Sequence, residues 1–276
     1  MKVKPIVKWA GGKRQLMENI IKLMPENYNK YYEPFIGGGA LLFELMPEEA
    51  TINDINTELM SIYHCLSNEK YFNLMINSLK KHEENHSEAY YLQVREKDKM
   101  DQFENLNIWE KAARTIYLNK TCFNGLYRVN KSGYFNVPSG KKVKAKTYDK
   151  DNIKLLHEYF LNKHITILNT DFEIALQSVK KGDFVYFDPP YDSLDNSKSF
   201  TAYTKFNFTK EDQIRLFKCY DNLSNSGAYL MLSNNNTPFI NELYEDYNIH
   251  IVNAKRMINS NGKGRGNVEE VLITNY

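Results

Sequence analysis

Short apolar stretches alternate with amphipathic stretches along much of the chain, and this pattern predicts strands followed by helices. The predicted strands are 31–36, 50–53, 165–168, 183–187, 228–232, 249–252 and 270–273. The predicted helices are 40–46, 172–180, 210–223 and 238–244, the third beginning after Thr209 as its N-cap. Strands and helices in alternation are typical of a mostly parallel sheet with helices on both faces. The pattern therefore predicts an α/β fold.

Residues 56–120 interrupt this alternation and are helix-like. Apolar side chains recur there at helical spacing, for example Leu59, Ile62, Tyr63 and Leu66. Residues 127–137 then predict a β-hairpin around an Asn-Lys-Ser-Gly turn. We interpret 57–150 as a second domain inserted into the first, which is then discontinuous and consists of 1–56 and 151–276.

The chain has 276 residues, of which 42% are hydrophobic and 25% charged. This composition excludes a mostly disordered or fibrous protein, and the length allows a sizeable core. No apolar run approaches the roughly 18 residues of a membrane-spanning helix, and the N-terminus lacks the features of a secretory signal. The three cysteines are isolated, which is typical of reduced thiols in a cytoplasmic protein. No His or Cys pair has the spacing of a metal site, so we expect no metal.

Basic residues gather in one part of the chain, although the net charge of the whole chain is only +2. Residues 111–150 contain ten Lys and Arg but one acid, Asp149. Aromatic side chains are interleaved with them, namely Tyr117, Phe123, Tyr127, Tyr134 and Phe135. Lys and Arg can neutralise phosphates and aromatic rings can stack on bases, so this segment is a candidate nucleic-acid surface. On charge alone, a solvated lysine-rich surface explains the segment slightly better.

A glycine-rich turn, Glu33-Pro34-Phe35-Ile36-Gly37-Gly38-Gly39, connects a predicted strand to a predicted helix. Glycines at such a place let the backbone approach a ligand closely and present free N–H groups. Asp54 follows at the end of the next predicted strand, where nucleotide-binding α/β folds place a carboxylate that accepts hydrogen bonds from ribose hydroxyls. The G-x-G-x-x-G pattern is absent, which disfavours a dinucleotide dehydrogenase. A turn without a ligand explains this motif, taken alone, about equally well.

The N-terminal motif Lys8-Trp9-Ala10-Gly11-Gly12-Lys13 places a lysine after two glycines, where it can meet a carboxylate. It is not a phosphate-binding P-loop, because the pattern G-x-x-x-x-G-K-[ST] is not met. Taken alone, a surface lysine in an N-terminal turn is the better interpretation of this motif.

The predicted strand 183–187 ends in Asp188-Pro189-Pro190-Tyr191. Open α/β sheets bind ligands at the carboxyl ends of their strands. The prolines stiffen the turn, so the Pro189 carbonyl can be held beside the Asp188 carboxylate. These two acceptors suit the two N–H donors of a planar amino group, and Tyr191 adds a flat face for an aromatic ring. A plain strand end with a proline turn is the weaker interpretation, because the acid, the prolines and the aromatic ring coincide at one strand end.

Taken together and in this order, the motifs resemble the DNA adenine-N6 methyltransferases of the Dam type, the D12-class, α-group enzymes that methylate adenine in GATC. The resemblance covers nearly the whole chain. It includes 124–128 and 133–138, which are similar to the recognition hairpin of the family, and 256–268, which is similar to its C-terminal loop. The resemblance implies a Rossmann-like catalytic domain that binds S-adenosylmethionine, with 57–150 as an inserted DNA target-recognition domain.

The resemblance also implies roles for individual residues. Those matched to catalysis are Asp188, Pro189, Pro190 and Tyr191. Those matched to S-adenosylmethionine binding are Trp9, Ala10, Lys13, Phe35, Gly37, Gly39, Asp54, Asp171, Phe172 and Asp188. Those matched to DNA binding are Lys8, Asn124, Leu126, Arg128 and Pro138. Asp171 and Phe172 also have a simpler interpretation, as a helix N-cap followed by a core side chain.

The activity implied is methyl transfer from S-adenosylmethionine to N6 of an adenine flipped out of double-stranded DNA, by a cytoplasmic enzyme that is a monomer in solution or on DNA. In this scheme Tyr191 stacks on the extruded base, Leu126 fills the gap left in the duplex, and Arg128 reads a guanine. Methylation at another DNA site, at cytosine N4 or at RNA adenine is the alternative among enzymes, because the same acceptors suit any planar amino group. A catalytically inactive nucleic-acid-binding module is the alternative from another class.

Overall fold

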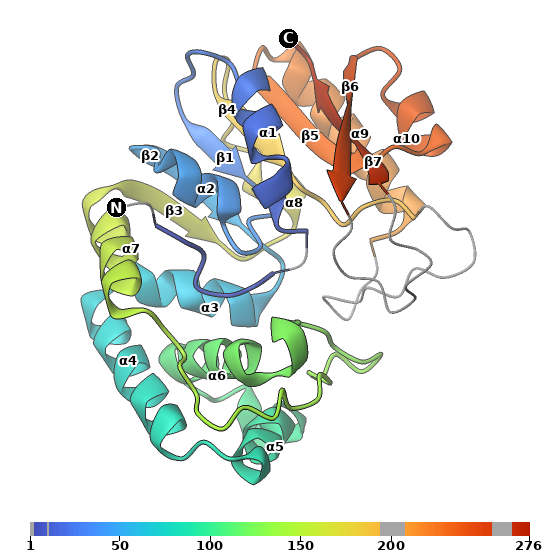
Figure 1. Ribbon diagram of the computed structural model, residues 1–276. Coiled ribbons are helices and arrows are strands. Elements are labelled where there is room, and N and C mark those ends of the chain that lie inside the picture. Colours follow the sequence, from blue (N-terminus) through green and yellow to red (C-terminus); the bar gives the residue numbers. More distant parts are fainter. Residues whose placement is uncertain (1–2, 10, 194–207, 256–266) are drawn as a thin grey trace.

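The computed structural model describes residues 3–9, 11–193, 208–255 and 267–276. These residues form a seven-stranded sheet in the order β3-β2-β1-β4-β5-β7-β6 (Figure 1). Its strands are β1 (Tyr31–Glu33), β2 (Glu49–Asn53), β3 (His164–Leu168), β4 (Phe184–Phe187), β5 (Tyr229–Asn235), β6 (Asn248–Lys255) and β7 (Asn267–Thr274). Strands β1 to β5 are parallel, whereas β7 runs antiparallel to both β5 and β6. The mostly parallel α/β sheet predicted from the sequence is confirmed.

The direction in which strands are added reverses between β1 and β4, which are neighbours in the middle of the sheet. From β1 the chain continues outward through β2 to β3, whereas from β4 it continues in the opposite direction to β5. Open α/β sheets bind ligands outside the carboxyl ends of the strands at such a switch point. The loop after β1 contains Gly37, and the loop after β4 begins with Asp188. The fold therefore brings the glycine-rich motif and the Asp-Pro-Pro-Tyr motif to one place.

Successive strand residues point to opposite faces of the sheet, and each face packs on its own helices. Tyr31 and Tyr186 belong to one hydrophobic core, while Tyr32 and Phe187 belong to the other. Helices that contribute to the first core include α1 (Met17–Leu23), α2 (Ala40–Leu45) and α7 (Lys150–Asn162). Those of the second core include α8 (Phe172–Ala175), α9 (Lys210–Asn225) and α10 (Pro238–Leu243). Both faces are covered, as predicted.

Some bounds and elements differ from the prediction. Strand β1 ends at Glu33, since the next residue is Pro34, which has no N–H for the ladder. Helix α8 ends at Ala175, five residues earlier than predicted. Helices α1 and α7 were not predicted, although α7 has a readable start signal: the Asp149 carboxylate accepts hydrogen bonds from the backbone N–H groups of the first turn. Thr209 caps α9 as predicted.

Between β2 and β3 the chain leaves the sheet and forms a helical segment that lies below it in Figure 1. This segment contains α3 (Thr57–Leu66), α4 (Glu69–Glu84), α5 (Glu88–Glu96), α6 (Ile108–Thr121) and the short turn η4 (Phe123–Gly125). The first hydrophobic core continues from the sheet into α3, α4 and α6. Across the described ranges, no helix has the length and apolar character needed to cross a membrane.

The predicted hairpin at 127–137 is a tight antiparallel turn with an isolated bridge between Val129 and Phe135, rather than a pair of strands. The Asn130 carboxamide oxygen accepts hydrogen bonds from the backbone N–H groups of Ser132, at 2.9 Å, and Tyr134, at 3.0 Å. Because a side chain engages these N–H groups, they are not available to extend a backbone ladder. The turn packs on α5 and α6 through its own small hydrophobic core.

Candidate active site

The glycine-rich turn after β1 is held in place by Asp54, which follows β2. The Gly37 N–H donates a hydrogen bond to Asp54 Oδ2 at 3.1 Å, and the Asn56 N–H donates to Asp54 Oδ1 at 2.9 Å. Burial raises the pKa of Asp54 to about 6, while these two N–H donors act in the opposite direction. Gly39 has a φ of +72°, and a Cβ there would lie 2.9 Å from the Tyr63 hydroxyl oxygen. The turn therefore requires glycine at this position, because both the positive φ and the neighbouring Tyr63 side chain exclude a Cβ.

Aromatic side chains line one flank of this turn. The ring centroids of Phe35 and Phe172 lie 5.5 Å apart, and that of Phe208 lies 5.8 Å from that of Phe35. Asp171 caps α8, as the simpler interpretation predicted, and its oxygens lie 3.1 and 3.2 Å from Arg215 Nη2. The Arg215 guanidinium also lies over the Phe172 ring, 5.0 Å from its centroid. Asp171 and Phe172 thus have structural roles next to the predicted cofactor loop.

Lys13 is buried and faces the Asp-Pro-Pro-Tyr motif. It is only 4% exposed, and its Nζ lies 2.6 Å from Asp188 Oδ1. The same ammonium group donates a hydrogen bond to the Gly11 carbonyl at 2.6 Å and lies 4.7 Å from the centroid of the Tyr191 ring. The interpretation of Lys13 as a surface lysine, favoured by its motif alone, is wrong: Lys13 is buried, and its carboxylate partner Asp188 lies far away in the sequence.

Asp188 sits at the end of β4 among groups that oppose the effect of its burial. Ser233 Oγ donates a hydrogen bond to Asp188 Oδ1 at 3.0 Å, and the hydroxyls of Ser233 and Tyr186 lie 3.2 Å apart. Burial raises the pKa of Asp188 above its usual range, while Lys13 and Ser233 act to lower it. The carboxyl group is therefore fixed in place and takes up a proton more readily than an exposed aspartate.

Side chains from α9, β5 and β7 fix the rest of the motif. Gln213 Nε2 donates to the Pro190 carbonyl at 2.9 Å, and Gln213 Oε1 accepts from Asn234 Nδ2 at 3.2 Å. The Tyr191 hydroxyl donates to Glu270 Oε2 at 3.0 Å. The sequence did not single out Gln213, Ser233, Asn234 or Glu270. The polar run Ser-Asn-Asn-Asn at the end of a predicted strand was the one available signal for two of them.

Glu33, at the end of β1, is a second buried acid close to this site. It is 3% exposed, and its Oε2 accepts a hydrogen bond from the Tyr31 hydroxyl at 2.7 Å. Burial raises the pKa of Glu33 to about 8; the negative charge of Asp188 acts in the same direction, and Tyr31 and Lys13 oppose it. The sequence placed Glu33 in the glycine motif but gave it no separate role. Nowhere in the described chain do His, Cys, Asp and Glu side chains gather in a group that could hold a metal ion.

The residues matched to DNA binding lie together, around η4 and the turn that follows it. Asn124, Arg128 and Pro138 are exposed and Leu126 is half-buried. Asn124 adopts a left-handed conformation with a φ of +56°. Arg128 Nε donates to Asn136 Oδ1 at 2.8 Å, which holds the guanidinium against the opposite arm of the turn.

The N-terminal segment lies between this cluster and the glycine-rich turn. Lys8 is exposed, whereas the Trp9 ring stacks on the Tyr127 ring with centroids 4.5 Å apart. A Cβ on Gly37 would lie 2.9 Å from Trp9 Cδ1, so Trp9 also packs on the glycine-rich turn. Ala10 and residues 256–266 of the predicted C-terminal loop and strand entry, 256–268, lie outside the described residues.

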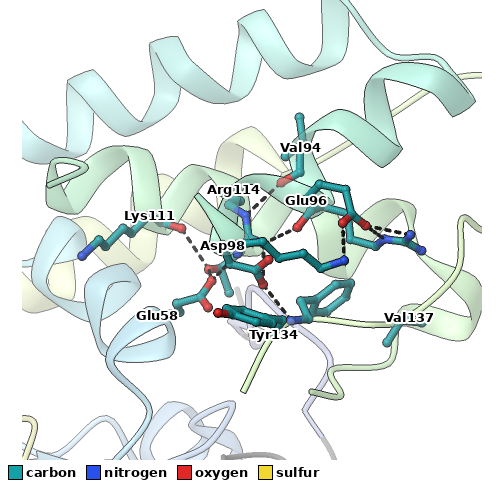
Figure 2. Close-up of polar contacts among 12 residues, drawn as sticks. Glu58, Val94, Glu96, Asp98, Lys111, Arg114, Tyr134 and Val137 are labelled. Carbon is teal, nitrogen blue, oxygen red and sulfur yellow. Dashed lines mark hydrogen bonds and ion pairs between the residues drawn. The ribbon is translucent and has the colours of Figure 1, made fainter. Parts of the chain in front are cut away.

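A buried ionic network anchors the 127–137 turn to the rest of the protein, as Figure 2 shows. Arg114 is 2% exposed; its Nη1 lies 2.7 Å from Glu58 Oε2 and its Nη2 lies 2.9 Å from Asp98 Oδ2. Asp98 Oδ2 also accepts a hydrogen bond from the Phe135 N–H at 2.7 Å. Arg114 further donates to two carbonyls of the α5 region, those of Val94 and Arg95. The network therefore connects the turn through α6 to the start of α3.

Comparisons with known proteins agree with this geometry. The family model for the D12 class N6 adenine-specific DNA methyltransferases matches residues 9–258. The chain is 44% identical to the Type II methyltransferase M1.LlaDCHI of Lactococcus lactis subsp. cremoris, over 99% of this chain and 96% of that protein. It is 45% identical to the Type II methyltransferase M.MjaIII of Methanocaldococcus jannaschii, over the full length of both. It is 30% identical to a DNA adenine methylase of Vibrio cholerae, over 98% of this chain and 95% of that protein. The chain belongs to the D12 class of N6 adenine-specific DNA methyltransferases.

Proposed function

We propose that this chain transfers a methyl group from S-adenosylmethionine to N6 of an adenine flipped out of double-stranded DNA, with GATC as its target. The observation that carries the proposal is the pair of acceptors at the end of β4, the Asp188 carboxylate and the Pro189 carbonyl. Among the described residues, none donates a hydrogen bond to the Pro189 carbonyl, whereas the Pro190 carbonyl is occupied by Gln213. A carbonyl that keeps its acceptor capacity, next in sequence to a fixed carboxylate, fits a planar amino group.

The adenine amino nitrogen is a weak nucleophile, because its lone pair is delocalised into the ring. Lys13 and Ser233 both contact Asp188 Oδ1, so we assign the amino hydrogens to Asp188 Oδ2 and the Pro189 carbonyl. Positive charge develops on the nitrogen as it attacks, and acceptors aimed at this charge stabilise the transition state more than the ground state. The methylated ammonium product is acidic and loses its proton afterwards, so Asp188 does not have to act as a strong base.

The residues around the glycine-rich turn fit S-adenosylmethionine. A Cβ on Gly37 or Gly39 would collide with Trp9 or Tyr63, so the glycines let the turn pack tightly against these side chains. Phe35 and Phe172 offer an apolar wall for a purine ring, and each Asp54 oxygen keeps acceptor capacity for ribose hydroxyls beyond its one backbone partner. When bound, this cofactor supplies an electrophilic methyl group. The chain's own contribution is to hold that group in line with the amino nitrogen at Asp188.

We propose that 57–150 is the DNA target-recognition domain and that 1–56 and 151–276 form the catalytic domain. Exposed Arg128 suits the two major-groove acceptors of guanine, and Leu126 suits the gap left by the extruded adenine. We assign Tyr191, whose hydroxyl donates to Glu270, to stacking on the extruded base. We extend the proposal to a cytoplasmic enzyme that acts as a monomer, and relatives named as type II methyltransferases support a restriction-modification setting.

The test is to incubate the protein with methyl-labelled S-adenosylmethionine and three duplexes: one with a single GATC, one with a single base pair of that site changed, and one with the site scrambled. The DNA is digested and the labelled nucleoside identified. N6-methyladenine on the GATC duplex alone is the expected result. Label on all three duplexes would remove GATC from the proposal, and label on cytosine would overturn the assignment to adenine.

A further inference from the structure

One buried carboxamide, that of Asn119 in the last turn of α6, contacts two segments that are far apart in the sequence. Asn119 is 1% exposed. Its Oδ1 accepts a hydrogen bond from the Lys8 N–H at 2.9 Å, and its Nδ2 donates to the Lys8 carbonyl at 2.8 Å. The same Nδ2 donates to the Gly125 carbonyl at 3.1 Å. Asn119 thus pairs with both backbone polar groups of Lys8, as a neighbouring strand would, and also holds η4.

The two segments held by Asn119 carry the side chains that the proposed function directs at DNA. Lys8 is exposed on the N-terminal segment, and Asn124 and Leu126 flank Gly125 on η4. Gly125 has a φ of +68°, and a Cβ there would lie 2.8 Å from Lys8 Cδ. The turn and the Lys8 side chain are therefore in close contact, at a spacing that the Asn119 hydrogen bonds set.

The residue after Lys8 extends this contact toward the cofactor loop. Trp9 stacks on Tyr127, just beyond η4, and packs on Gly37. Because Trp9 follows Lys8 directly, hydrogen bonds that fix the Lys8 backbone also fix the orientation of the Trp9 backbone. The two hydrogen bonds between Asn119 and Lys8 are part-buried, and their loss removes the protein partner of both Lys8 backbone groups.

We propose that Asn119 is a positioning residue for target recognition, which holds Lys8 and η4 together as one rigid reading unit. This inference rests on the proposed function. Asn119 touches neither DNA nor the reacting atoms; it acts through the placement of Lys8, Asn124 and Leu126. Removal of its carboxamide loosens that placement, so sites with one changed base pair are rejected less well.

The test compares Asn119→Ala with the wild type in the ratio of kcat/KM on the GATC duplex to kcat/KM on a duplex with one base pair changed. This ratio does not depend on the fraction of protein that is folded, so a merely structural role does not move it. We expect the ratio to fall about tenfold, within the range that single base contacts contribute. The matched control is Thr121→Val, because Thr121 is fully buried in the same turn of α6 and its hydroxyl donates to the Tyr117 carbonyl within the helix.

Asn119→Asp keeps the shape of the side chain and the acceptor for the Lys8 N–H but removes both N–H donors, so it serves if the alanine variant does not fold. A ratio unchanged from wild type in the folded Asn119 variant, or an equal fall in Thr121→Val, would overturn the inference. If the wild type methylates GATC and the Asn119 variants discriminate against the altered duplex as well as the wild type does, only this role of Asn119 is refuted. Wild-type protein that methylates neither duplex refutes the proposed function and, with it, the inference.

Discussion

The ammonium group of Lys13 lies 2.6 Å from Asp188 Oδ1, inside the protein and at the carboxyl edge of the sheet. This ion pair joins the N-terminal motif to the Asp-Pro-Pro-Tyr motif. It forms because the switch point of the sheet places the loop after β4 next to the loop after β1, and Lys13 begins η1 (Lys13–Gln15), which contacts the helix α2 that follows β1. Two motifs that are separate in the sequence therefore form a single site.

Lys13→Met should move the pH dependence of methyl transfer. Burial already raises the pKa of Asp188, and Lys13 is the charge that most opposes this effect. Without Lys13 the pKa of Asp188 rises further, so the carboxylate is lost at a higher pH as the solution is acidified. We expect the acidic limb of the single-turnover rate profile to shift to higher pH and the rate at neutral pH to fall about 10- to 100-fold. An acidic limb at the wild-type position would contradict the assigned role of the ion pair.

Glu33→Gln should change how stability depends on pH. Burial raises the pKa of Glu33 from an ordinary 4.5 to about 8 in the folded protein. Between these two values the folded state binds a proton that the unfolded state has released. The free energy of unfolding therefore falls as the pH rises from about 5 to about 8. Glutamine does not titrate, so the free energy of unfolding of the Gln variant, measured with urea, should increase relative to that of the wild type between about pH 5 and pH 8. The exposed acid Glu18, replaced by Gln, is the control and should leave the pH dependence unchanged.

Arg128→Ala should relax specificity at one base pair of the target. A guanidinium that reads guanine contributes discrimination of about 1–3 kcal/mol at that position. The rate on a duplex altered at that base pair should therefore approach the rate on the cognate duplex, while other altered positions remain rejected. The exposed Lys131, replaced by Ala, is the control in the same turn. An equal loss on cognate and altered duplexes would instead make Arg128 a phosphate contact.

Arg114→Met should destabilise the protein strongly. The substitution leaves Glu58 and Asp98 buried without their cation, and breaking a buried ion pair in this way costs about 3–5 kcal/mol. The measurement is the free energy of unfolding in urea. Lys111→Met, on the same helix, is the control, because Lys111 pairs at 3.5 Å with the exposed Glu104 and should cost less than about 1 kcal/mol. A loss for Arg114→Met as small as that of the control would show that the network does not anchor the turn.

Features that depend on residues close together in the sequence could be predicted from the sequence. The strand and helix alternation, the Gly37 turn and the Asp188 motif are local patterns, and each lies where its pattern placed it. The alternation at 127–137 predicts a hairpin, but the structure has only an isolated bridge there, because the Asn130 side chain competes with the backbone ladder. Helix α1 lacks a side-chain cap, so its start gave no signal.

Features that depend on contacts between distant segments could not be predicted in the same way. Lys13 looked like a surface residue because its carboxylate partner is brought to it only by the sheet order. Ser233, Gln213 and Asn119 are buried polar side chains whose partners lie on other elements. A buried polar residue has to find partners, but the sequence alone does not say which.

The most direct test is the single-turnover rate of Asp188→Ala on the GATC duplex, measured beside the affinity of the same variant for that duplex. In the proposed mechanism the Asp188 carboxylate stabilises the positive charge that develops on the amino nitrogen in the transition state. Removal of the carboxylate should therefore lower the rate by about 10²–10³-fold or more, as the loss of comparable transition-state contacts does. Duplex affinity should stay within a few fold of wild type, since we propose that residues 123–138 and Lys8, and not Asp188, read the target. A variant that methylates the duplex at a near-normal rate would show that the chemistry does not take place at Asp188.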